Sequence, residues 1–366
     1  MALSMIALLI TLVALAAIMQ LISLRRDTSL VMYDFTMSAA ATEPGAPVTL
    51  QTIITNQSRL PIPYLAVKEV FPACTQLPEN MANVHRARGD DIRVLQTCYV
   101  RGRKRKKLSL EVSILKRGVH YFRGDSLVFG DFLGFSDFTK AIICRKEIIV
   151  YPQRRDDPDL TDALGKFCGD ASARRFLIRD PILTVGTREY TGREPMKEMH
   201  WMQSARKGEL MVREFDHNRQ LSACVIMCID GIEFWEDERI DNICILARTV
   251  CETLADAGVT VKFVTNAKLR NVIGKGTWSC VVSPSRKGEL LEGLGRVLGY
   301  TTASMEGALD SAYRGSDHDT AFIVILPSGD ILPSGDILPS GNPAGVDAIN
   351  GLRQKTSQEI MVLNSD

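Results

Sequence analysis

The residue types that could carry out catalysis are all present in this sequence, but their spacing forms no familiar catalytic motif. Residues 274–277 (Gly-Lys-Gly-Thr) lack the upstream glycine that a phosphate-binding loop needs. Neither His-Glu-x-x-His nor Gly-x-Ser-x-Gly occurs, and these are the motifs of zinc peptidases and of serine hydrolases. We therefore predict a protein that is not an enzyme and that needs no cofactor.

The histidines and cysteines are too scattered to predict a metal centre. The five histidines lie far apart, and the nine cysteines include no Cys-x-x-Cys pair, so the sequence indicates neither a zinc cluster nor a disulfide framework. We interpret the cysteines as free thiols that pack as small apolar side chains, which favours a reducing compartment.

The charge balance gives the whole chain no field that would collect nucleic acid or acidic substrates, since 44 basic residues face 43 acidic ones. One local exception is residues 101–107, which are basic at every position except Gly102. This run is typical of a solvated hairpin tip. The alternative is a loop that attracts anionic lipid head groups.

The first 26 residues predict a membrane anchor. Residues 2–24 contain only four polar side chains, which is enough apolar length to cross about 30 Å of hydrocarbon. Arg25 and Arg26 follow the run and no basic residue precedes it, so the positive-inside tendency places the soluble parts in the cytoplasm. We expect a single-pass cell-membrane protein, with an exported orientation as the alternative.

Residues 27–152 predict a β-sandwich domain. Short runs rich in β-branched and aromatic residues are separated by turn residues such as Pro, Gly and Asn, with little helical periodicity. One of the predicted turns is Arg123-Gly124-Asp125.

Residues 221–366 alternate between strand and helix patterns, as a doubly wound α/β domain should. Strands are expected at 222–229, 259–265, 320–326 and 359–363, and helices at 238–257, 286–298, 305–313 and 343–354. Ligands of such folds gather at the carboxyl ends of the strands, which here means Asp230, residues 265–266 and the segment after Leu326.

A connecting segment, residues 153–220, carries a pattern that includes Arg-Glu-Tyr at 188–190, His-Trp at 200–201, Ala-Arg-Lys-Gly at 205–208 and Val-Arg at 212–213. Together with residues 117–122 and 129–135, this pattern resembles the bacterial and archaeal family called domain of unknown function 58. This chain has Arg193-Glu194 where many members carry Gly-Asp. The candidate site residues are Arg188, Tyr190, Glu194, Lys197, His200, Trp201, Arg206 and Arg213.

The resemblance implies a von Willebrand factor A-like α/β domain and a protein that works beside a MoxR-type AAA+ ATPase in envelope assembly or maintenance. We therefore expect a non-enzymatic, membrane-tethered interaction or scaffold protein, with a protein partner and no nucleic acid. The charged pattern suits either an ion-pair lattice that holds the domains together, with Trp201 as its apolar anchor, or a docking site.

The alternative function is a metal-dependent adhesion module of von Willebrand factor A type, exposed outside the membrane. Metal-binding domains of that type carry Asp-x-Ser-x-Ser after the first strand, where this chain has Asp-Gly-Ile-Glu-Phe at 230–234. Because both hydroxyl positions are lost, we predict no metal site and retain Asp230 only as a weak candidate ligand.

A hexapeptide, Leu-Pro-Ser-Gly-Asp-Ile, repeats almost three times over residues 326–341. Its Pro and Gly residues exclude a helix, and three units are too few to build a solenoid core. We predict a duplicated surface loop.

Overall fold

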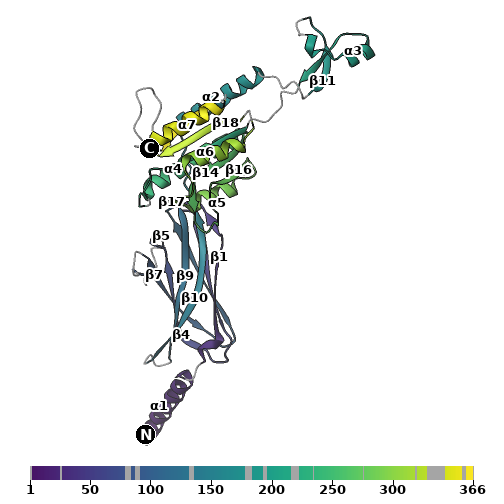
Figure 1. The fold of residues 1–366 in the computed structure, drawn as a ribbon. Coiled ribbons are helices and arrows are strands. Elements are labelled where there is room, and N and C mark those ends of the chain that lie inside the picture. The colour runs from purple at the N-terminus through teal and green to yellow at the C-terminus, as the bar shows by residue number, and fades with distance from the viewer. Residues whose placement is uncertain are drawn as a thin grey trace. The chain divides into compact units, whose positions relative to one another are not determined.

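The computed structural model describes most of the chain, in two compact units (Figure 1). Unit 1 is Met1–Gln153 and unit 2 is Arg154–Asp366. The sequence pattern ends the β-rich part at residue 152; the full four-part division stays a prediction. The described residues are 2–24, 27–78, 84–86, 91–131, 136–177, 184–192, 196–215, 222–233, 235–274, 276–317, 320–327, 343–356 and 360–365.

Helix α1 (Ala2–Leu24) opens unit 1, and its apolar side chains are mostly exposed. Within the described part of the chain, no helix has the length and apolar character to cross a membrane. The predicted anchor over residues 1–26, the single-pass location and the membrane tether are therefore wrong.

Two antiparallel-dominated sheets form the rest of unit 1. The first has the order β1-β3-β8-β5 and the second β2-β10-β9-β4-β7-β6. The strands are β1 (Val31–Met37), β2 (Ala41–Thr42), β3 (Pro47–Asn56), β4 (Ile62–Phe71), β5 (Thr75–Gln76), β6 (Val84–Arg86), β7 (Ile92–Val100), β8 (Arg105–Ile114), β9 (Gly118–Gly130) and β10 (Asp137–Val150), after the short helix η1 (Thr28–Leu30).

The two sheets face each other across a shared apolar core. Every second residue of β3 is buried, because alternate side chains of a strand point to opposite faces. Phe35 of the first sheet and Phe71 and Phe122 of the second meet in this core, and the Phe71 and Phe122 rings pack edge to face with centroids 5.0 Å apart.

Unit 2 is built on a five-stranded sheet of order β16-β14-β13-β18-β19. Its strands are β13 (Ser222–Met227), β14 (Thr260–Thr265), β16 (Trp278–Val282), β18 (Ala321–Pro327) and β19 (Ile360–Ser365). Side chains of α2 (Pro158–Leu177), α4 (Asp237–Asp256) and α5 (Gly288–Arg296) share a core with one face of the sheet. Those of α6 (Met305–Arg314) and α7 (Pro343–Lys355) share a core with the other face.

The predicted fold class is wrong as stated. The described residues are largely β and form five sheets. Strand β16 joins β14 antiparallel, so the unit 2 sheet is mixed. The physical reason is the connection from β14 to β16, which contains the short strand β15 (Ala267–Leu269) instead of the crossover helix that a parallel neighbour requires. Strand β15 pairs with β17 (Val297–Thr301). The last two residues of the helix predicted at 286–298 therefore belong to β17.

One further sequence expectation is corrected by the structure, and another lies outside the described residues. The predicted turn at residues 123–125 is the middle of β9, where a Cβ on Gly124 would lie 2.7 Å from the Ile142 side chain. Gly124 is therefore needed for close strand approach beside a bulge and not for a turn. The hexapeptide repeat lies outside the described residues, apart from Leu326 and Pro327 at the end of β18.

Candidate interaction site

The part of the family-like pattern between positions 184 and 215 forms a small two-stranded module within unit 2, defined here as residues 184–192 and 196–215. Strands β11 (Thr184–Glu189) and β12 (Met211–Phe215) pair antiparallel, with Arg188 opposite Val212. Between them lie the 3₁₀ helix η2 (Met196–Glu198) and helix α3 (Trp201–Lys207). We call this the β11–β12 module.

Hydrogen bonds fix α3 to the strands. The Nδ1 atom of His200 accepts from the N–H of Gln203 at 3.2 Å, so this imidazole caps the helix. The Ser204 hydroxyl accepts from the N–H of Met211 at 2.8 Å and donates to the His200 carbonyl at 3.1 Å. Gly208 ends the helix in the left-handed conformation, at φ 74°.

The module buries a few apolar side chains and exposes others. Met199, Met211 and Val212 are buried. Four apolar side chains remain exposed, and we call them the Trp201 surface: Met196 at 70%, Trp201 at 57%, Met202 at 67% and Leu210 at 48%. The exposed charged side chains described in the module are basic at Arg188, Lys197, Arg206 and Lys207 and acidic at Glu189 and Glu209.

The structure brings most of the predicted site residues into this one module. Arg188, Lys197 and Arg206 are exposed, as is Trp201, and Tyr190 and His200 are half-buried. Arg213 lies opposite Thr187 in the β11–β12 pair, but its side chain and the whole of Glu194 lie outside the described residues. Trp201 is 57% exposed in the structure. The ion-pair lattice itself stays a prediction.

Asp230 lies just beyond the carboxyl end of β13, where it accepts a hydrogen bond from the Asn266 amide. Burial raises the pKa of Asp230, and the Asn266 hydrogen bond opposes that rise. Asn266 is fully buried and also accepts from the N–H of Ile229 at 3.1 Å, so it ties two strand ends together. In the described ranges, no three His, Cys, Asp or Glu residues are placed to hold a metal ion.

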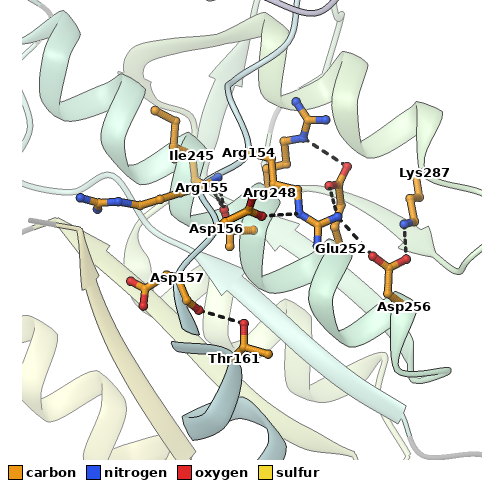
Figure 2. A network of polar contacts seen from close by, with 11 residues as sticks. Arg154, Arg155, Asp156, Asp157, Thr161, Ile245, Arg248, Glu252, Asp256 and Lys287 are labelled. Atoms are coloured by element: carbon orange, nitrogen blue, oxygen red, sulfur yellow. Dashed lines mark hydrogen bonds and ion pairs between the residues drawn. The ribbon is translucent and has the colours of Figure 1, made fainter. Parts of the chain in front are cut away.

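A polar network at the start of unit 2 was not foreseen from the sequence (Figure 2). Glu252 of α4 accepts from Arg248 at 3.1 Å and from Arg154 at 3.3 Å, and the Arg248 and Glu252 side chains are both buried. Arg154 also contacts Asp256 at 3.2 Å, and Lys287 pairs with the same carboxylate. The Lys287 hydrogen bond lowers the pKa of Asp256. The network fastens the first residues of unit 2 to α4, and the spacing of Arg248 and Glu252 was its only sequence signal.

A second unforeseen group is the buried carboxyl of Glu69 in unit 1, which is 2% exposed. Its Oε1 accepts from the hydroxyls of Tyr33 and Thr52, each at 2.6 Å. Burial raises the pKa of Glu69, and the two hydroxyl donors oppose that rise. Nothing in the sequence around Glu69 predicts that this carboxyl is buried.

Comparison with known proteins places no family name on this chain. No family model matches the sequence, and no curated protein matches it either. Among solved structures, a type II cohesin domain from the cellulosome of Acetivibrio cellulolyticus is similar at 10% identity and a TM-score of 0.25, over 32% of this chain and 94% of that one.

A cohesin module from the family 33 glycoside hydrolase of Clostridium perfringens is similar at 12% identity and a TM-score of 0.24, over 33% of this chain and 97% of that one. The seventh ScaB type I cohesin from Pseudobacteroides cellulosolvens gives 14% identity and a TM-score of 0.23, over 34% and 96% of the two chains. Likeness of this size carries no argument about what this chain binds.

Proposed function

We propose that this chain is a non-enzymatic interaction protein that docks a partner through the β11–β12 module, and that the partner is an AAA+ ATPase of MoxR type acting in envelope assembly or maintenance. The class of partner rests on the resemblance to the domain of unknown function 58 family. The observation that carries the proposal is the Trp201 surface, because Trp, Met and Arg are enriched where proteins bind each other.

The chemistry of the Trp201 surface sets what the partner must offer. Full burial of a large apolar side chain contributes roughly 1.5–3 kcal/mol, so the exposed parts of these four contribute roughly 4–7 kcal/mol. Association itself costs about 4–15 kcal/mol, so apolar burial alone gives weak binding. Arg206 lies one helical turn after Met202, and a partner groove with an acidic rim would pair with it.

The module is organised before any partner arrives. The contacts of Ser204 and His200 hold α3 against β12, so Trp201 and Met202 leave the helix from a fixed backbone. A fixed backbone lowers the ordering cost of association. Methionine side chains still adapt to the shape of a groove.

The test is capture of the partner by the tagged full-length protein, after mild crosslinking in its own cells, with and without ATP. We expect an AAA+ ATPase to be recovered with the natural chain and to be missing with Trp201→Ala/Met202→Ala. The matched control is Ile143→Ala/Ile273→Ala, which shortens two fully exposed apolar side chains on other elements. Recovery of no ATPase, or equal recovery with the Trp201 variant, would contradict the proposal.

A further inference from the structure

Six basic side chains lie in the loop that joins β7 of the second sheet to β8 of the first, and in the first three residues of β8. The hairpin expected at residues 101–107 is therefore wrong, because β7 and β8 belong to different sheets. All six are exposed, and none of them forms an ion pair with another described residue. No acidic residue occurs anywhere between positions 92 and 110, so β7, the loop and the start of β8 supply no counter-charges of their own. We call this set the basic tip, and its members are Arg101, Arg103, Lys104, Arg105, Lys106 and Lys107.

The backbone beneath the basic tip is held by the buried side chain of Asn56, which is 1% exposed. Its Nδ2 donates to the carbonyls of Leu60 at 2.9 Å and Arg101 at 3.2 Å. Its Oδ1 accepts from the N–H of Ser58 at 3.1 Å, and its own N–H donates to the Lys104 carbonyl at 3.0 Å. Two loops are thus fixed together, and a fixed surface loses little freedom when a ligand binds.

Two neighbouring residues show how tightly the turn is specified. A Cβ on Gly102 would lie 2.1 Å from the Arg59 carbonyl oxygen, so no side chain fits there. Arg103 has φ +56°, a left-handed conformation that favours Gly, Asn or Asp. Arg103 therefore adopts a backbone conformation that would be less strained with Gly at this position. Backbone strain of this kind is found most often at functional sites.

Apolar side chains border the basic tip. Leu60 is 39% exposed and Tyr99 is 51% exposed. Leu30, also 39% exposed, is brought to the same end of the sandwich because its carbonyl accepts from the N–H of Gln57 at 3.0 Å. Cations mixed with exposed Leu and Tyr suit a ligand that presents charge on an apolar support as well as a free anion.

We propose that the basic tip is a binding site for phosphate groups held close together. Guanidinium groups pair with phosphate through two parallel hydrogen bonds, and Lys binds it as a point charge. A lipid phosphodiester and an internal unit of a polyphosphate each carry about one negative charge, so six cations match about six phosphates held close together. The source is either a cluster of phospholipid head groups or a soluble polyphosphate, because both present this chemistry.

The test measures binding of the full chain to three probes at several salt concentrations. They are inorganic polyphosphate, vesicles of phosphatidylglycerol compared with vesicles of phosphatidylcholine, and polyglutamate as a carboxylate polymer. The vesicle readout is the difference between binding to phosphatidylglycerol and binding to phosphatidylcholine. Apolar binding through α1 contributes equally to both lipids and cancels in this difference. Binding to polyphosphate alone assigns a soluble source, and preference for phosphatidylglycerol assigns a lipid source.

Three variants locate the site. Arg103→Glu/Arg105→Glu changes the charge by four units and should weaken binding more than a hundredfold, at about 1 kcal/mol or about fivefold per charge. The matched control Lys166→Glu/Lys268→Glu makes the same charge change at two exposed sites in unit 2 and should leave binding within about twofold. Arg103→Gly should weaken binding about fivefold without lowering the melting temperature, since Gly relieves the left-handed strain.

The salt dependence gives an independent readout. The slope of log binding constant against log salt should shrink by about 0.7–0.9 for each phosphate that a variant no longer neutralises. The proposal would be overturned if the chain bound neither polyphosphate nor phosphatidylglycerol vesicles. Equal weakening in the unit 2 control, or equally tight binding of polyglutamate, would overturn it as well. None of these outcomes depends on the β11–β12 module.

Discussion

The buried carboxyl of Glu69 makes the stability of unit 1 depend on pH in a direction opposite to that of a typical paired carboxylate. Burial raises its pKa above the ordinary value of 4.5 in the folded chain. As the pH rises, the unfolded chain therefore releases this proton first. The free energy of unfolding should fall from about pH 4.5 upward, until the pH passes the folded pKa, by up to about 1.4 kcal/mol per pH unit.

A Glu69→Gln substitution should remove this dependence. The amide oxygen can still accept from the hydroxyls of Tyr33 and Thr52, and the side chain stays neutral at every pH. Burial of the new NH₂ group adds a constant cost of about 1–3 kcal/mol if it finds no acceptor. The readout is therefore the change with pH of the difference between variant and natural chain. Glu111→Gln on β8 is the control, because Glu111 is exposed.

The assay exploits the distribution of tryptophan. All three tryptophans, at positions 201, 235 and 278, belong to unit 2, so tryptophan fluorescence follows unit 2 while circular dichroism follows both units. Urea unfolding of the full chain should be followed between pH 4 and pH 8. The Glu69 effect should occur only in the unfolding of unit 1, which circular dichroism detects and tryptophan fluorescence does not. Equal pH slopes in the natural chain and in Glu69→Gln would refute the reasoning, as would an effect confined to the fluorescence transition.

Three further substitutions should change stability in predictable ways. Glu252→Gln leaves the buried Arg248 without its carboxylate and should cost about 3–5 kcal/mol, read by tryptophan fluorescence. Phe122→Ala empties a fully buried position between the two sheets and should cost about 3–5 kcal/mol in the unit 1 transition. Gly102→Ala forces its Cβ against the Arg59 carbonyl and should lower the melting temperature of unit 1, whereas an unchanged value would show that the turn can shift.

The strands and helices with a strong periodic pattern were predictable. The β-rich segment predicted at residues 27–152 contains β3 and β4, whose side chains are buried at roughly every second position. The helix expected at 238–257 is α4, and the one at 305–313 is α6. The Gly124 position was misinterpreted because a glycine needed for close strand approach looks the same in sequence as a glycine in a turn.

Helix α2 was missed although its signals are present. Asp157 caps it by accepting from the N–H of Leu160 at 3.1 Å, and Pro158 occupies its first position. Leu160, Leu164 and Phe167 recur at helical spacing and pack on the unit 2 core. The charged residues around them weaken the helical pattern, so the sequence predicts only a connecting segment at residues 153–220.

The candidate site was predictable by position but not by exposure. The family-like pattern located the module that carries Trp201, but a tryptophan among charged residues suits a buried anchor and an exposed contact equally well. The polar contacts of Glu69 were beyond reach, because Tyr33 and Thr52 join it only when β1, β3 and β4 come together from distant parts of the chain.

The pairing of strands also sets an order of events during synthesis. Every strand of the sandwich pairs within residues 31–150, but the unit 2 sheet needs β19, which begins about 210 residues after β10 ends. At about 5–20 residues per second, the ribosome needs about 10–40 s to cover that distance. Unit 1 therefore has time to fold while the sheet of unit 2 still lacks an edge strand. A chaperone or protease acting on the nascent chain would meet a finished sandwich followed by unprotected, strongly apolar strands.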